Sequence, residues 1–186
     1  MHLRLGKANG VFGRLTNIWT DNGLSLHIKI SLYEALVLST LLYGAETWSM
    51  SVSNTKKLEA AHHRWQRKIL KIILKDMITN KTVRETTGQD TLKSVIRERR
   101  LRCRTYVFRM DSNRIAQQAM DWIPSDFKKK RGRFRVSWTS TVKKDLDLLG
   151  LTWEEALDLK KDAWIGETVL PDVLLQREEG LSKFSK

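Results

Sequence analysis

The strongest hydrophobic pattern in the chain lies between Ser31 and Trp48. Its apolar residues recur at helical spacing and spread over more than one face, which predicts a central helix that its neighbours cover. These residues are Leu32, Tyr33, Leu36, Val37, Leu38, Leu41 and Leu42. Gly44 stands where the pattern stops and favours a left-handed helix end or a close backbone approach.

A helix is predicted on each side of this stretch. Before it, apolar residues from Leu5 to Trp19 follow one helix face, and Asp21-Asn22-Gly23 favours a turn. After it, Asn54 or Thr55 can cap a long helix that continues to Lys75. Its inner face comprises Leu58, Ala61, Trp65, Ile69, Ile72 and Ile73. A basic stripe runs beside that face through Arg64, Lys68, Lys71 and Lys75.

Further helices are predicted in the second half of the chain. A short helix starts at Thr79 or Asn80 and ends at Gly88, and Asp90 can cap the next one, which runs towards Met110. The apolar positions of that helix are Leu92, Val95, Ile96, Cys103, Tyr106, Val107 and Met110, with Arg97, Arg100, Arg102 and Arg104 on the remaining surface. Later helices are expected from Ser112 to Pro124, from Trp138 to Gly150, and after the capping box Thr152-Trp153-Glu154-Glu155.

No alternating strand pattern extends over more than a few residues, so the expected fold class is all-α. We expect a multi-helix bundle over residues 1–88, then a smaller helical C-terminal subdomain over 89–165 with a linker at 124–133, and a disordered tail over 166–186. The apolar segment between Leu32 and Leu42 is too short to span a bilayer. With Cys103 as the lone cysteine, an internal disulfide is excluded. We therefore expect an intracellular protein, nuclear or cytoplasmic.

The charge distribution points to a polyanionic partner, with nucleic acid first and an anionic membrane second. The chain has 34 Lys and Arg against 21 Asp and Glu, and residues 93–135 alone carry a net charge of +10. Aromatic residues are interleaved with these cations, but we assign them mainly to packing. The candidate phosphate contacts are Arg64, Lys68, Lys71, Arg99, Arg100, Arg102, Arg104, Lys128, Lys129, Lys130, Arg131 and Arg133.

No pattern predicts catalysis, a metal, a cofactor or a small-molecule substrate. The acidic residues are scattered or explained by helix capping, whereas two-metal chemistry needs clustered carboxylates. Adjacent helical residues such as His62 and His63 point about a hundred degrees apart, so one partly buried histidine and one on the basic surface are expected. Cys103 lies on an apolar stripe and is expected to be a packed thiol.

Several stretches occur in the order found in a known family. They are Gly13-Arg14-Leu15 to Trp19, Lys29 to Trp48, Leu58 to Arg64, Ile78-Thr79-Asn80, Arg99-Arg100-Leu101-Arg102, Val107 to Met110, Gly132-Arg133 with Trp138, and Asp145-Leu146 through Ala156. Together they resemble the region downstream of the catalytic palm in the reverse transcriptase of LINE-type (non-LTR) retrotransposons. The sequence departs from the family at Cys103 to Tyr106, at Gly132-Arg133-Phe134 and at Asp162-Ala163-Trp164.

The resemblance implies a thumb, a helical bundle that grips the template-primer duplex, followed by a segment that binds element RNA or target DNA. It places Arg64, Lys68 and Lys71 towards a duplex and the remaining candidate cations beyond it. The polymerisation carboxylates of the family lie in the palm, and nothing here matches that motif or the endonuclease domain. The resemblance therefore implies the binding part of an enzyme without its chemistry.

Three alternatives stay open. The chain could be a helical protein-interaction module whose basic segment serves nuclear import or docking to an acidic surface. It could be a decayed copy, translated from an internal Met1, without a selected function. An intact enzyme of another type is the least favoured reading, because no constellation of catalytic residues is found.

Overall fold

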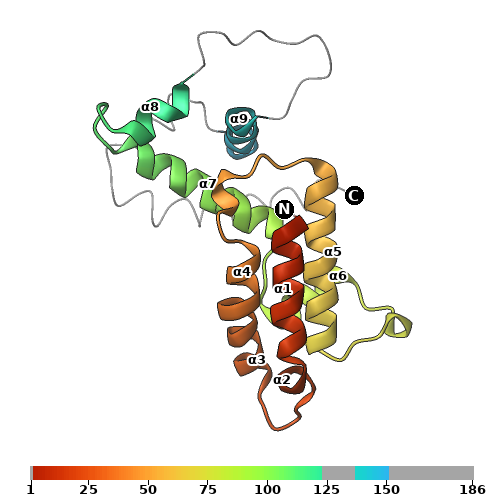
Figure 1. Cartoon of the computed structure of the whole chain (residues 1–186). Coiled ribbons are helices and arrows are strands. Elements are labelled where there is room, and N and C mark those ends of the chain that lie inside the picture. The colour runs from red at the N-terminus through yellow and green to blue at the C-terminus, as the bar shows by residue number, and fades with distance from the viewer. Residues whose placement is uncertain (1, 123–136, 151–186) are drawn as a thin grey trace. The chain divides into compact units, whose positions relative to one another are not determined.

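The computed structural model describes residues 2–122 and 137–150, and every regular element among them is helical (Figure 1). The predicted all-α class is confirmed. The elements are α1 (His2–Arg14), α2 (Thr16–Thr20), α3 (Leu26–Leu32), the π-helix η1 (Tyr33–Leu38), α4 (Ser39–Leu41), the 3-10 helix η2 (Ala45–Thr47), α5 (Val52–Ile69), the 3-10 helix η3 (Leu74–Asp76), α6 (Asn80–Thr87), α7 (Leu92–Phe108), α8 (Ile115–Asp121) and α9 (Trp138–Leu149).

The chain divides into two compact units. The first comprises the described residues of 1–45 and 51–96, and the second those of 46–50 and 97–186. The division falls inside α7, so this helix contributes its first turns to one unit and the rest to the other.

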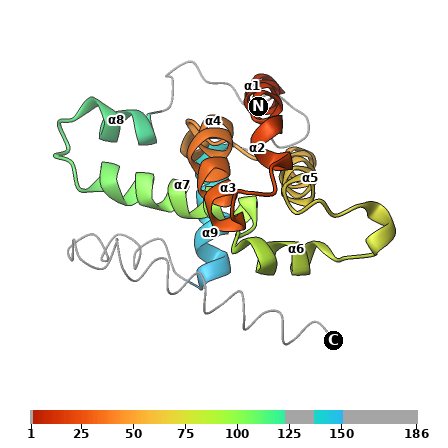
Figure 2. The ribbon, with the colours of Figure 1, turned by 90° about the horizontal axis from the view of Figure 1, so that it is seen from below.

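The first unit is a bundle in which the chain runs along α1, returns through α3, η1 and α4, and reverses again along α5 (Figures 1 and 2). Its core is aromatic. The ring centroid of Phe12 lies 5.1 Å from that of Trp19 and 5.8 Å from that of Trp65, and Tyr33 meets Phe12 edge-on at 6.5 Å. Stacked and edge-to-face pairs add to the burial of apolar area, so these rings hold α1, α2, η1 and α5 together.

The central helix predicted around Ser31 is present, but it is not covered on every side. Tyr33, Val37, Leu41 and Leu42 are fully buried, whereas Leu36 is 41% exposed. The π-helical turn of η1 holds more residues than an α-helical turn, which shifts the register of the residues that follow. Gly44 then takes the left-handed conformation (φ 71°), which is the first of the two possibilities that the sequence left open.

Two helix boundaries in this unit differ from the sequence expectation. The first helix is interrupted at Leu15, whose backbone leaves the helical region, so α1 and α2 are separate. The cap of α5 is Ser51, whose hydroxyl accepts the Asn54 N–H at 3.3 Å, rather than Asn54 or Thr55. The predictions for α6 are confirmed, since Thr79 caps its start and Gly88 ends it with φ 65°.

In the second unit, the helix predicted from Trp138 to Gly150 is present as α9. Ser137 and Ser140 form a capping box at its start, and Gly150 ends it with φ 62°. The start of α7 belongs to the first unit, and Thr91 rather than Asp90 caps it, because the Thr91 hydroxyl accepts the Ser94 N–H at 3.2 Å. Helix α8 begins at Ile115 and not at Ser112. The predicted capping box at Thr152, the linker from Ser125 to Arg133 and the tail lie outside the described residues.

Candidate nucleic-acid interface

Helix α5 has a core face and a cationic face, as its sequence predicts. Leu58, Trp65 and Ile69 are buried, and Arg64 and Lys68 are exposed beside them. The helix ends at Ile69 rather than near Lys75, and Ile73 is 58% exposed instead of lying on the inner face.

The end of α5 is set by Lys71, which takes the left-handed conformation with φ 59°. The Ile72 N–H then donates to the Arg67 carbonyl at 2.9 Å, the hydrogen bond that closes a Schellman motif. The Lys71 ammonium donates to the Thr20 carbonyl at 3.0 Å and to the Asn22 side-chain carbonyl. This contact to the turn after α2 fixes Lys71 beside the last turn of α5.

A hollow of about 630 Å³ lies along this cationic face. We call it the α5 groove, and its lining residues are Ala60, His63, Arg64, Arg67, Lys68, Lys71, Ile72, Ile73 and Asn80. Residues three and four positions apart share a face of a helix, so Arg64, Arg67 and Lys68 converge on the groove. Lys71 follows the helix end, and its contacts with Thr20 and Asn22 place it beside them. The groove therefore unites the three predicted thumb contacts with a fourth cation, Arg67.

Arg64 and Arg67 are oriented by neutral acceptors. The Arg64 guanidinium donates to Asn9 Oδ1 at 3.1 Å, and the same atom accepts the Trp65 indole N–H at 3.1 Å. The Arg67 guanidinium donates to the Ile78 carbonyl at 2.6 Å and to Asn80 Oδ1 at 3.0 Å. Lys68 lies over the Phe12 ring, with its ammonium 5.7 Å from the centroid. Within residues 2–122 and 137–150, none of the four groove cations forms an ion pair with a carboxylate.

His63 lines the groove and is half-buried, as expected for the histidine on the basic side. Its Nε2 atom lies 3.1 Å from the Arg84 guanidinium, so the neutral ring accepts a hydrogen bond there. Burial lowers the pKa of His63, and Arg84 and Arg67 lower it further, while Glu59 opposes them. Burial and the neighbouring guanidinium groups thus favour the neutral ring.

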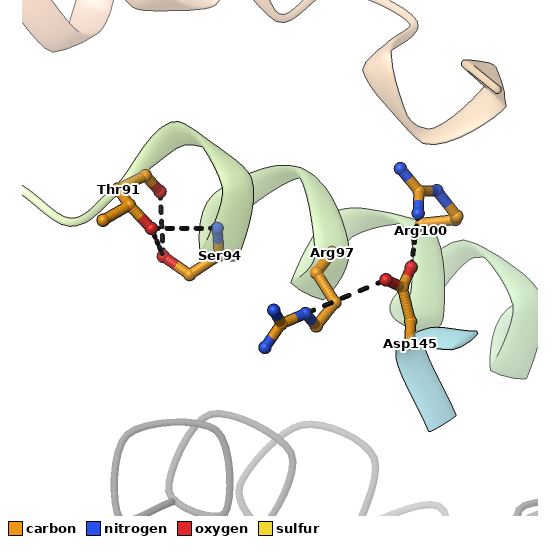
Figure 3. A network of polar contacts seen from close by, with 5 residues as sticks. All are labelled: Thr91, Ser94, Arg97, Arg100 and Asp145. Carbon is orange, nitrogen blue, oxygen red and sulfur yellow. Dashed lines mark hydrogen bonds and ion pairs between the residues drawn. The ribbon is translucent and has the colours of Figure 1, made fainter. Parts of the chain in front are cut away.

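The cations predicted on α7 separate into two groups. Arg99 and Arg102 are exposed, whereas Arg100 is 3% and Arg104 is 5% exposed. Arg100 forms an ion pair with Asp145 of α9, and Arg97 Nε lies 3.8 Å from the other carboxylate oxygen (Figure 3). The Arg104 guanidinium lies over the rings of Phe108 at 4.3 Å and Trp138 at 5.8 Å. In this arrangement Arg100 and Arg104 are covered by protein.

The remaining candidate cations, Lys128, Lys129, Lys130, Arg131 and Arg133, lie outside the described residues. Sequence reasoning missed Arg67 and His63 as groove residues. The signal for Arg67 was available, because it lies three residues after Arg64 on the same helix face. Asn9, Asn22 and Asn80 accept hydrogen bonds from the groove cations. No local sequence pattern predicts these contacts, since they join chain segments far apart in sequence.

The structure also describes the other residues that the sequence analysis considered for chemistry. His62 is fully buried, and burial raises the pKa of the half-buried Cys103 thiol, with Glu46 adding to the effect. Over the described ranges, no group of three or more His, Cys, Asp or Glu side chains could hold a metal ion. In the same part of the chain, the helices lack either the length or the apolar character needed to cross a membrane.

Comparison with known proteins gives one weak similarity. The chain is 24% identical over 151 residues to a Caenorhabditis elegans protein described as transposon-derived, and the match covers 78% of this chain. The chain spans about half the length of that relative, since the match covers 53% of it. No family model matches the sequence, and no solved structure matches it.

Proposed function

We propose that the chain is a transposon-derived nucleic-acid-binding protein that corresponds to the thumb and downstream segment of a non-LTR retrotransposon reverse transcriptase. The observation that carries the proposal is the α5 groove, in which Arg64, Arg67, Lys68 and Lys71 line one hollow. Its ligand is the phosphate backbone of a template-primer duplex.

The hydrogen-bond partners of these cations support binding to the phosphate backbone of a nucleic acid. Arg64, Arg67 and Lys71 donate to amide or carbonyl oxygens, which orient a charged group but do not neutralise it. The positive charge of the groove therefore remains available to bind an anion. Arginine presents several N–H donors in a fork that suits phosphate oxygens. Cations that neutralise the phosphates of a nucleic acid also release the counterions condensed on it, which favours binding.

Two sequence relationships agree with this assignment. The relative from C. elegans carries the description transposon-derived. The resemblance to the reverse transcriptase thumb rests on residues that include Leu58 to Arg64, the stretch of α5 that leads into the groove.

A titration with a fluorescent primer-template duplex tests the proposal. The double variant Arg64→Ala/Lys68→Ala is expected to bind at least tenfold more weakly than the wild type, because two phosphate contacts are lost. The control Lys7→Ala/Lys93→Ala removes the same charge from exposed positions that do not line the groove. Equal losses in both variants would indicate a response to net charge alone and would contradict a groove-specific contact.

The proposal assigns binding to the chain and no reaction. Incubation of the purified protein with primer-template, deoxynucleotides and Mg²⁺ is expected to leave the primer neither extended nor cleaved. Extension or cleavage that persists in independent preparations would contradict this part of the proposal and favour an intact enzyme.

A further inference from the structure

The part of α7 in the second unit has two opposite faces that both carry arginines. At 100° per residue, Arg97, Arg100 and Arg104 lie within an arc of about 60°, and this face is buried against α9. Arg99, Arg102 and Tyr106 lie within an arc of about 60° on the opposite side. Arg109 follows the last residue of α7 and continues this side, since its N–H still donates to the Thr105 carbonyl at 3.2 Å. All four are exposed. We call this second set the α7 stripe. It extends over about 15 Å of helix axis.

Tyr106 is the unexpected member of the stripe. Its place in the hydrophobic pattern predicts burial, but its side chain is 62% exposed, while the neighbouring Val107 is 8% exposed. The buried side of α7 is instead occupied by Leu101, Val107 and the arginines that meet α9. An exposed tyrosine ring between arginines offers an apolar surface with positive charge at both ends.

Two basic groups of the stripe, those of Arg102 and Arg109, are available to an anionic partner at low cost. Arg102 donates to Glu98 Oε1 at 2.5 Å within the same helix, and its side chain remains 53% exposed. Exposed pairs of this kind contribute little stability, so a phosphate can replace the carboxylate. The Arg109 side chain donates to the Thr105 carbonyl at 3.4 Å, which is a neutral acceptor.

We propose that the α7 stripe binds single-stranded nucleic acid, with an unpaired base stacked on Tyr106 and the flanking phosphates at Arg102 and Arg109. A positively charged track with an exposed aromatic ring is the arrangement by which proteins bind single strands. Charge complementarity selects a polyanion, and the ring selects one whose base faces are open, because in a duplex those faces are already stacked. The α7 stripe shares no residue with the α5 groove. The absence of single-strand binding at the stripe would therefore leave duplex binding in the groove unaffected.

The test uses the full chain and a short single-stranded oligonucleotide that contains 2-aminopurine, whose fluorescence is quenched when the base stacks. Wild-type protein is expected to quench it, and Tyr106→Leu is expected to bind about 5- to 150-fold more weakly with the quenching lost. Tyr106→Phe keeps the ring and is expected to bind like the wild type. Duplex affinity is expected to be the same in all three proteins.

Tyr43→Leu is the matched control. Tyr43 is 67% exposed, but the Arg4 guanidinium already lies 4.3 Å from its ring centroid, so this ring is not offered to a base. The variant is expected to leave single-strand binding unchanged. Wild-type affinity in Tyr106→Leu, or an equal loss in Tyr43→Leu, would overturn the proposal. So would failure of the single strand to bind while an acidic peptide binds at Tyr106. The variant Arg64→Ala/Lys68→Ala separates the two sites, because it is expected to weaken duplex binding and leave the quenching intact.

Discussion

The Tyr33 hydroxyl lies 2.6 Å from Nδ1 of His62, and both side chains are fully buried. Gln66 Nε2 lies 3.1 Å from the other ring nitrogen and 3.3 Å from the Thr87 hydroxyl, which donates to the Val83 carbonyl at 2.9 Å. Because the Gln66 amide donates, Nε2 accepts and Nδ1–H donates to Tyr33. Neutral His62 thus connects η1, α5 and α6 inside the first unit.

This network predicts that stability decreases in mildly acidic solution. Burial lowers the pKa of His62 to about 4, and His63 and Arg84 contribute. The unfolded chain takes up a proton as pH falls below about 6.5, but the folded chain does not until about 4. The contribution of His62 is therefore complete above pH 6.5 and is lost as pH falls towards 4, by at most about 3 kcal/mol.

Denaturant unfolding between pH 7.5 and 4.5 measures this loss. His62→Gln is expected to be less stable at pH 7.5 and to show a flatter pH dependence than the wild type. His27→Gln changes an exposed histidine and is expected to retain the wild-type dependence. If the unfolding free energy of His62→Gln still falls steeply with pH, groups other than His62 cause the loss of stability.

Tyr33→Phe tests the same network and leaves the His62 imidazole in place. The substitution removes the acceptor of the Nδ1–H group and leaves that donor buried, which costs about 1–3 kcal/mol of unfolding free energy. Burial raises the pKa of Tyr33, with a further contribution from Glu59, so the phenol remains protonated at physiological pH. Chemical denaturation monitored by circular dichroism gives the value, and an unchanged midpoint would show that the hydrogen bond contributes nothing.

Asp145→Asn is expected to destabilise the second unit. The substitution removes the carboxylate from between two buried guanidinium groups, those of Arg97 and Arg100, and breaking such a buried pair costs about 3–5 kcal/mol. Asp147→Asn provides the control, because it removes an equal charge from the exposed side of α9. Equal stability of the two variants in urea would contradict the role of Asp145.

Duplex binding is expected to strengthen as pH falls through the range in which His63 titrates. A phosphate in the α5 groove favours the imidazolium, so binding raises the pKa that burial, Arg84 and Arg67 hold down, and a proton is taken up on binding. His63→Gln is expected to remove this pH dependence and leave the affinity at pH 8 unchanged. Anisotropy titrations between pH 5.5 and 8 measure both quantities, and a pH dependence that is unaltered in His63→Gln would place the titrating group elsewhere.

The sequence predicted those parts of the fold that depend on neighbours along the chain. Thr79, Gly88 and Gly150 mark helix ends by their own conformational preferences, and the structure confirms them. The end of α5 was missed because a lysine rarely adopts positive φ; here contacts with Thr20 and Asn22 accompany that conformation.

Some of the predicted binding residues are buried and others are exposed, and the contacts that decide this join residues far apart in sequence, so no local pattern predicts them. Arg100 and Arg104 were placed on the surface because arginine is seldom buried, but Asp145 lies 45 residues from Arg100 in sequence and covers it. Tyr106 lies on the side of α7 opposite to that contact and is 62% exposed, although its spacing predicts an apolar face. The α5 groove followed more closely from sequence, since three of its four cations, Arg64, Arg67 and Lys68, lie on one face of a single helix.

The salt dependence of duplex binding tests the central claim most directly. If the groove cations contact phosphates, the logarithm of the affinity falls linearly with the logarithm of salt concentration. The magnitude of that slope should then decrease by about 2 in Arg64→Ala/Lys68→Ala, with no such change in Lys7→Ala/Lys93→Ala. A wild-type affinity that hardly responds to salt, or a slope that the groove variant leaves unchanged, would contradict nucleic-acid binding through the α5 groove.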